Sequence, residues 1–250
     1  MNPLLAFLRF EVGRLLRNWK FLAITVGFPV VFYVLFLHDR SPGKVVDNAV
    51  PWRVYLMVSM GSFAALVASL NAGGSRLSAE RASGWARQLR VTPIPAWSFV
   101  ATKVTASMLV VLPVLVPVEI VGAAFGGVHL GLGTWVGLTL LLWVSALPLA
   151  ILGVLVGFMV HQETAYPVVT ALMFVLGYFG GLFDPVSNMS SPLQTAARAL
   201  PSFHHASLGL ALIDGRGFGV EDALVLAAYA VALGLAVMAK HRWEEARGLA

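Results

Sequence analysis

The sequence contains no cysteine and few charged residues. None of the 250 residues is Cys, and Asp, Glu, Lys and Arg together make up only 12% of the chain. The absence of Cys excludes disulfides, thiolate metal sites and cysteine nucleophiles. A soluble domain is about a quarter charged, because water must solvate its surface. At half that share, most of the surface of this chain must face something other than water.

What the chain has instead is apolar residues in long runs. Hydrophobic residues account for 58% of it, and a helix needs about 20 mostly apolar residues to cross a bilayer, with roughly 17 as the lower limit. We predict a transmembrane span in each of six runs, namely residues 21–37, 54–70, 99–121, 135–160, 165–183 and 223–239. Since these runs take up most of the sequence, we predict one all-α integral membrane domain covering residues 1–250.

The distribution of Lys and Arg predicts the orientation, because cytoplasmic loops of membrane proteins carry an excess of these residues. With a cytoplasmic N-terminus, twelve of the 17 basic residues fall on the inner side. The outer segments hold the other five, which are Arg40, Lys44, Arg53, Arg198 and Arg216. We therefore predict that both termini are cytoplasmic. The net charge of +5 reflects this orientation, and we expect no nucleic-acid partner.

Residues 4–20, ahead of the first span, have the pattern of an amphipathic helix. Its apolar side chains fall on one face, and they are Leu4, Leu5, Leu8, Val12, Leu15, Leu16 and Trp19. Basic side chains occupy the remaining faces, where they can meet anionic headgroups; they are Arg9, Arg14, Arg17 and Lys20. We predict that this helix lies in the membrane interface. The alternative is a helix packed on a soluble partner.

The segment between the second and third spans, residues 71–97, is long for a loop and rich in Arg. We predict a short helix over residues 75–90, ended by Pro93 and Pro95, since proline cannot continue a helix. Arg76 and Glu80 stand four residues apart and can pair on its surface. On charge alone, a solvated basic loop that sets topology explains the segment as well as a docking surface does.

Residues 184–218 precede the last span and contain two apolar pieces broken at Pro201 and Gly209. These pieces are too short to cross a bilayer, so we predict re-entrant or interfacial helices on the outer side. His204 and His205 are adjacent and would point to different faces of a helix. Because no nearby carboxylate or cysteine completes a ligand set, we predict no metal site.

Glu119 is the only acidic residue inside an apolar run, and a carboxylate inside a membrane is a functional candidate by default. Either it lines a transport pathway or it marks the outer interface. Helical rise places it about 24 Å above Lys103, close to the far edge of a core about 30 Å thick. That height favours the interface.

Small residues in the fourth and fifth spans allow helices to approach closely. Gly153 and Gly157 stand four residues apart in the fourth span, and Gly177 and Gly180 lie in the fifth. Such spacing is common in membrane helices, so we expect contacts within the subunit.

One segment resembles a known family. Its residues are Glu80-Arg81, Gly84, Arg87, Leu89, the run Arg90-Val91-Thr92-Pro93-Ile94-Pro95, Trp97 and Lys103. The acidic–basic pair, the glycine, the L-x-V-T-P pattern and the lysine are similar to those of ABC-2 type permeases. These are the membrane subunits of exporters such as the daunorubicin-resistance and nodulation-factor exporters. The resemblance covers essentially the whole chain, although Arg87 and Arg90 make the loop more basic than in many relatives.

The resemblance implies a function. Residues 75–90 would be the coupling helix, with Glu80, Arg81, Gly84, Arg87 and Arg90 docking into a cleft of a cytoplasmic ABC ATPase. Two ATPase subunits, which bind ATP and Mg, would drive two permease subunits, paired as a homodimer or a heterodimer, through alternating access. The complex would export a hydrophobic or amphipathic drug, lipid-like molecule or peptide across a bacterial plasma membrane, as in multidrug efflux and antibiotic resistance.

The sequence itself also requires a separate ATPase for such a function. It has no G-x-x-x-x-G-K-[ST] phosphate loop, and its only Gly-Lys pair, Gly43-Lys44, is followed by Val. We therefore predict a transport subunit with no catalytic residues rather than an enzyme, since no carboxylate cluster, metal motif or serine elbow is present. The alternative is a secondary transporter or channel without an ATPase, which would favour inverted repeats and charges at the midplane.

Overall fold

In the computed structural model, almost every described residue lies in a helix, which confirms the predicted all-α fold. The structure describes residues 13, 17, 19–38, 45–46, 50–83, 96–215 and 219–246. The long helices are α2 (Trp19–His38), α3 (Trp52–Leu70), α6 (Ala96–Ala124), α7 (Leu132–Ser145), α8 (Leu147–Met159), α9 (Gln162–Phe179) and α12 (Val220–Ala246). Shorter elements are the π-helical turn η1 (Asn71–Ser75), α4 (Arg76–Ala82), the 3-10 turn η2 (Val186–Asn188), α10 (Ser191–Ala197) and α11 (Pro201–Ile213). Two strands of two residues, β1 (Val45–Val46) and β2 (Val50–Pro51), pair antiparallel with Val46 opposite Val50.

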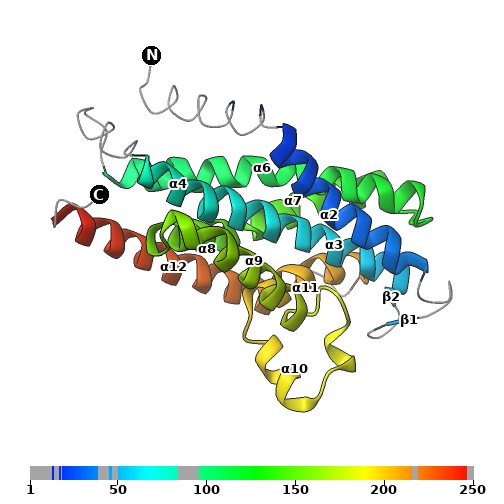
Figure 1. The fold of residues 1–250 in the computed structure, drawn as a ribbon. Helices are drawn as coiled ribbons and strands as arrows, with labels where there is room; N and C mark the ends of the chain where they lie inside the picture. The colour runs from blue at the N-terminus through cyan, green and yellow to red at the C-terminus, as the bar shows by residue number, and fades with distance from the viewer. Residues whose placement is uncertain are drawn as a thin grey trace.

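The long helices run roughly along one axis, so the bundle has two ends (Figure 1). One end carries the end of α4, the start of α6 and the ends of α8 and α12, and we call it the α4 end. The opposite end carries the β1–β2 hairpin and α10, which projects from the bundle in Figure 1, and we call it the α10 end. In the predicted orientation the α4 end is cytoplasmic. That orientation stays a prediction.

Four helices of the described chain are long and apolar enough to cross a membrane, namely Trp52–Ala82, Trp97–Ala124, Leu132–Met159 and Val220–Glu244. They correspond to the predicted second, third, fourth and sixth spans. The first and fifth predicted spans correspond to α2, whose apolar part Leu22–Leu37 is shorter, and to α9. The protein is therefore a multi-pass membrane protein by length and composition, whereas the number of six spans stays a prediction.

α3 lies at the centre of the bundle. In the helix Trp52–Ala82, 94% of the most apolar stretch is buried, against 11% in Val220–Glu244. The neighbours of α3 are α2, α6, α8, α9 and α11, and its Leu56, Met60 and Phe63 have no exposed surface. A helix that is apolar or small all round suits burial on every side. Most of the other long helices therefore pack around α3, whereas α12 packs against α8, α11 and α6.

The helix that contains α3 does not end at Asn71, where we predicted the start of a loop. It continues through η1 into α4. A Cβ on Gly73 would stand 2.5 Å from the backbone nitrogen of Val154 in α8, and one on Gly157 would stand 2.8 Å from Cβ of Leu77. Because only glycines permit this approach, α8 packs along η1 and α4 and stabilises them as helix. The contact that we expected for Gly153 and Gly157 of the fourth span within the subunit is confirmed.

Two predicted segments are described only in part. Of the predicted helix 75–90, residues 75–82 are helical and prolong the second span, and Ser83 lies in a turn. Residues 84–90 lie outside the described residues. Of the predicted interfacial helix 4–20, only residues 13, 17, 19 and 20 are described; each is helical, and Trp19 is exposed.

Between α9 and α12, α10 projects from the bundle and α11 returns to it (Figure 1). α11 packs against α3, α7 and α12. The predicted break at Gly209 is wrong, because α11 runs from Pro201 through Gly209 to Ile213. A Cβ on Gly209 would stand 2.8 Å from Cγ1 of Val58. This glycine therefore lets α11 approach α3 instead of ending the helix.

Candidate functional site

Glu80 and Lys103 form a buried ion pair at the α4 end. Lys103, early in α6, donates to the carboxylate of Glu80 on α4. The exposed fractions of the two side chains are 4% for Lys103 and 8% for Glu80. Arg76 lies one turn before Glu80, with its Nε 3.6 Å from Oε1 of Glu80, which confirms the predicted pairing of these two residues. Charges taken out of water need such partners, because leaving one unpaired costs several kcal/mol.

Arg81, the next residue along α4, contacts two other helices. Its guanidinium donates to Oε1 of Glu244 in α12 at 2.7 Å, and to the backbone oxygens of Gly157 and Phe158 at 3.1 and 2.6 Å. Those carbonyls belong to the last turn of α8, where no intrahelical donor reaches them and where the helix dipole favours a cation. Arg81 therefore joins α4, α8 and α12.

Glu244 pairs with more than one cation. Its carboxylate is only 4% exposed, and Nζ of Lys240, one turn earlier in α12, lies 3.3 Å from the Oε1 that also accepts from Arg81. The neighbouring His241 is buried against the rings of Phe99 and Phe158, with ring centroids 6.0 and 5.5 Å away. α12 is thereby held to α6 and α8 as well as to α4.

We call the charged residues joined in this way the α4-end cluster; they are Arg76, Glu80, Arg81, Lys103, Lys240 and Glu244. Four of them are cations and two are anions, so the cluster carries a net charge of +2. The sign agrees with the side that we predict to be cytoplasmic. The cluster can transmit movement between helices, because a displacement of α4 reaches α6 through Glu80 and reaches α8 and α12 through Arg81.

Of the residues that the sequence singled out for coupling, Glu80 and Arg81 lie in this cluster. Gly84, Arg87 and Arg90 lie outside the described residues. The carboxylate of Glu80 is turned into the bundle toward Lys103, so a contact of Glu80 with an ATPase stays a prediction. Two partners in α12, Lys240 and Glu244, were not predicted, and both lie just beyond the predicted sixth span. Their spacing of four residues was the available signal.

Glu119, the other singled-out residue, lies in α6 five residues before the helix ends at Ala124. Its Oε2 accepts a hydrogen bond from Oγ1 of Thr139 in α7 at 2.6 Å, and the residue is buried. Its place near the end of α6 agrees with an interfacial position, and a role in transport stays a prediction.

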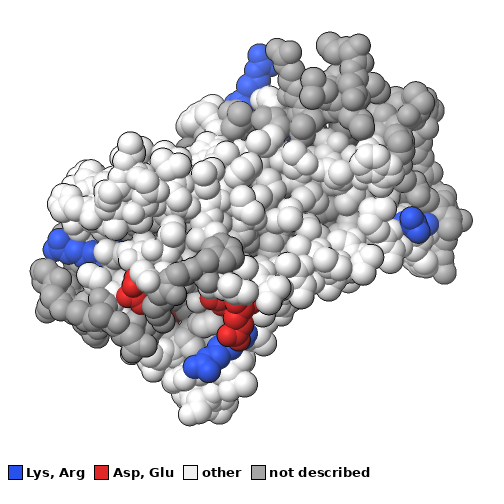
Figure 2. Space-filling model, turned by 180° about the vertical axis from the view of Figure 1, so that it is seen from behind, with Lys and Arg blue, Asp and Glu red and all other residues white. Residues whose placement is uncertain are grey.

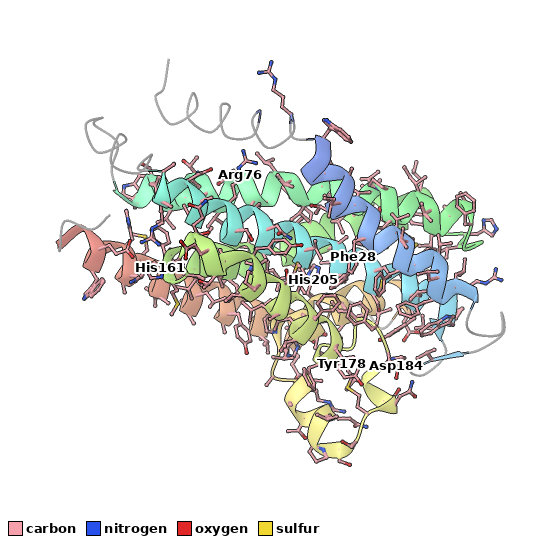
Figure 3. All side chains as sticks on the ribbon, in the orientation of Figure 1. Phe28, Arg76, His161, Tyr178, Asp184 and His205 are labelled. Atoms are coloured by element: carbon pink, nitrogen blue, oxygen red, sulfur yellow. The ribbon has the colours of Figure 1, made fainter. Side chains whose placement is uncertain are left out.

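His204 and His205 in α11 have separate partners. Nδ1 of His205 lies 2.8 Å from Oγ of Ser145, and this histidine is buried inside the bundle (Figure 3). Nδ1 of His204 lies 2.6 Å from Oδ1 of Asp222 at the start of α12. Packing of α12 on α11 thus brings one carboxylate, Asp222, to His204, a contact that the sequence did not predict. Within the described ranges, no group of three or more His, Asp or Glu side chains could hold a metal.

Known proteins resemble this chain over most of its length. The model of a family described as "ABC-2 family transporter protein" matches residues 43–239. In Bacillus subtilis (strain 168), the protein named "Putative transport permease YvfS" is 29% identical to this chain over 223 residues. That similarity covers 88% of this chain and 89% of the Bacillus protein. The family match includes α4 and the start of α6, and with them Glu80, Arg81 and Lys103 of the α4-end cluster.

Proposed function

The chain belongs to the family of ABC-2 transporter proteins, and on that premise we propose that it is the permease subunit of an ATP-driven exporter. Its family makes it a membrane transport permease. In our proposal, two cytoplasmic ABC ATPase subunits bind ATP and Mg and supply the energy. A second permease subunit, identical or different, completes the pathway in a bacterial plasma membrane. The substrate is a hydrophobic or amphipathic drug, lipid-like molecule or peptide, moved outward by alternating access.

The observation that supports this proposal most is the α4-end cluster. A pump driven by a separate ATPase needs a connection through which movement of the ATPase reaches the membrane helices. The predicted coupling helix, residues 75–90, begins with α4, and α4 is tied to α6 by Glu80 and to α8 and α12 by Arg81. A force applied beyond Ser83 would therefore move these helices together instead of bending α4 alone.

This geometry divides the predicted coupling residues between two roles. Glu80 and Arg81 are occupied by partners in the same chain, so we assign them to transmission of movement into the bundle. Gly84, Arg87 and Arg90 remain the proposed contacts with the ATPase, where arginines can meet acidic side chains. The division is testable, because loss of contact and loss of transmission have different signatures.

The test uses the complex of this chain with its ATPase. Glu80→Gln keeps the size of the side chain but removes the charge that faces Lys103. We expect the ATPase to copurify normally with this variant, while ATP-dependent export falls at least about tenfold, because disrupting a buried charge pair costs roughly 2–5 kcal/mol. The double variant Arg87→Gln with Arg90→Gln should instead lose copurification. Arg242→Gln is the matched control, since it removes an exposed charge from α12 outside the cluster.

Two results would contradict the proposal at different levels. Wild-type export by Glu80→Gln, at equal amounts in the membrane, would remove the cluster from the mechanism. Export by the permease in the complete absence of an ATPase would contradict the proposal as a whole. That second result would favour a secondary transporter or channel.

A further inference from the structure

A cavity of about 580 Å³ lies at the α10 end, between α10, α11 and the start of α12. Pockets for small molecules typically measure roughly 300–1,000 Å³. One wall is apolar and comes mainly from Phe203, Ala206 and Leu210 of α11. Another part of the wall is polar, with Arg198, directly after α10, and Glu221 of α12 among its residues. A cavity with these two walls suits a ligand with an apolar and a polar part.

Hydrogen bonds hold the polar wall in place. Asp222 of α12 accepts from Oγ of Ser207 at 2.8 Å, and its other oxygen faces Nδ1 of His204 at 2.6 Å. Nε2 of His204 lies 2.7 Å from the backbone oxygen of Arg198. These contacts join α11, α12 and the residue directly after α10 next to the cavity. A site formed in advance loses less entropy when it binds.

Two charged side chains of the lining, Arg198 and Glu221, are free to meet a ligand. Both are exposed, and neither side chain has a hydrogen bond or ion pair with another residue of the described ranges. The third charged residue of the lining, Asp222, is already matched by His204. Figure 2, seen from the side opposite to Figure 1, shows acidic and basic atoms next to each other on the projecting part of the molecule. The unmatched charges at the cavity are therefore one cation and one anion.

We propose that this cavity binds an amphiphile whose polar group is zwitterionic, with an amine cation and an acidic group close together. The amine meets Glu221, the phosphate or carboxylate meets the guanidinium of Arg198, and the apolar part lies on the α11 wall. Arginine suits both kinds of acidic group, because its planar fork can bond two oxygens. A purely anionic or purely cationic amphiphile would leave one charge of the cavity unmatched. The proposal goes beyond export, since binding is a property of the permease alone.

The test measures binding to the purified full chain in a nonionic detergent. Three probes of equal chain length are compared: lysophosphatidylethanolamine as zwitterion, lysophosphatidylglycerol as anion and an alkyltrimethylammonium as cation. We expect the wild type to bind the zwitterion most tightly. Arg198→Gln should shift the preference toward the cation, and Glu221→Gln should shift it toward the anion. Each shift should be roughly two- to fivefold, the effect of an exposed ion pair.

Shifts in opposite directions cannot come from a general loss of fold, so the two variants control each other. Glu163→Gln removes an exposed carboxylate at the start of α9, away from the cavity, and should shift neither preference. Equal affinity for the three probes, or the same shift in both variants, would overturn the proposal. Such a failure would leave the proposed export unaffected, since the measurement uses neither ATP nor ATPase.

A second measurement identifies the source of the zwitterion. Lipids that copurify with the wild type and with Arg198→Gln are compared by mass spectrometry. Loss of a zwitterionic lipid from the variant identifies a bilayer lipid as the occupant. Unchanged lipid with an altered preference among exported amphiphiles identifies an exported zwitterion. Unchanged lipid together with unchanged export would count against an occupied site.

Discussion

The guanidinium of Arg81 and the carboxylate of Glu244 lie 2.7 Å apart, although 163 residues separate them in the chain. The two partners are not equivalent. Without Arg81, the buried Glu244 keeps, within the part of the chain that the structure describes, only the salt bridge to Lys240, and the last carbonyls of α8 lose a donor. Without Glu244, Arg81 still donates to those carbonyls. Loss of Arg81 therefore removes more contacts between α4, α8 and α12 than loss of Glu244 does.

We expect Arg81→Leu to destabilise the protein more than Glu244→Gln does. The first change leaves the buried carboxylate of Glu244 with only the more distant Lys240 and takes a donor from two carbonyls, at a cost of roughly 2–3 kcal/mol. The glutamine of the second change still offers an oxygen to Arg81. For a chain of this size, the cost corresponds to a fall of about 4–12 °C in the thermal unfolding midpoint, measured in nonionic detergent. Arg242→Leu is the control, and a wild-type midpoint for Arg81→Leu would contradict the assignment.

Gly73→Ala should destabilise the contact between η1 and α8. The new Cβ would stand 2.5 Å from the backbone nitrogen of Val154, and a backbone atom cannot move aside as a side chain can. Overpacking of this kind costs roughly 1–3 kcal/mol. Gly234→Ala in α12 is the matched control, because a Cβ added at Gly234 would have no neighbouring atom within 4 Å. We expect the control to be neutral or slightly stabilising, and equal unfolding midpoints for both variants would contradict the packing argument.

We expect the stability of the fold to depend on pH through His204. Its two ring nitrogens face two acceptors, the carboxylate of Asp222 and the backbone oxygen of Arg198, and only the imidazolium can donate to both. His204 lies in α11, outside the predicted spans. The hydrogen bond to Asp222 is the main cause that raises the pKa of His204 above its ordinary value, and burial opposes it. The folded state therefore holds this proton more tightly than the unfolded chain does.

The sign of the pH effect follows from that raised pKa. The contact stabilises the fold fully below about pH 6.5, the unfolded pKa of histidine, and this stability is lost as the pH rises through the folded pKa. We expect the unfolding midpoint of the wild type to exceed that of His204→Gln at low pH, with a difference that shrinks as the pH rises. His161→Gln, at an exposed position, should show no such trend. A difference that stays constant with pH would contradict the assignment of a protonated His204 that donates to both acceptors.

The orientation can be tested with single cysteines, because the chain has none of its own. Ser190 at the α10 end and Ser83 at the α4 end are both exposed. An impermeant thiol reagent should label Ser190→Cys in intact cells, and should label Ser83→Cys only after the membrane is disrupted. Comparable labelling of both cysteines in intact cells would contradict the predicted orientation.

Glu119→Gln should leave export nearly unchanged if Glu119 marks the interface. The glutamine oxygen can still accept from Oγ1 of Thr139, and only the ionisable group is lost. Thr139→Val removes the donor and should lower stability by about 1 kcal/mol, which shows whether the contact forms. A changed turnover or substrate preference of Glu119→Gln, with an unchanged unfolding midpoint, would instead place the carboxylate in the pathway.

The positions of the long helices could be predicted because an apolar run is a local property of the sequence. The continuation of α3 into α4 could not. Asn71, Gly73 and Gly74 resemble loop residues, and the chain keeps a helical path there only because Gly153 and Gly157 of α8 allow close packing. Gly209 was misread for a similar reason, since a helix breaker in the sequence serves as a contact point in the fold.

In the candidate site too, local contacts could be predicted from the sequence and contacts between distant helices could not. The pairing of Arg76 with Glu80 could be predicted, because both lie on one helix face four residues apart. The partners Lys103 for Glu80 and Glu244 for Arg81 depend on how distant helices pack, which no local pattern reveals. The burial of Glu80 likewise depends on α6, so it could not be predicted from the sequence, where only the family resemblance implied a docking role for this carboxylate.

The order of the helices along the chain gives the α4-end cluster a consequence for biosynthesis. α4 and α6 are synthesised before α12, so Glu80 and Lys103 can pair early, whereas Arg81 must wait for Glu244. A chain that stops short of α12 can form the link between α4 and α6 but not the link to α12. Only a nascent chain that has been translated through α12 can therefore complete the connection that we propose for the response to an ATPase.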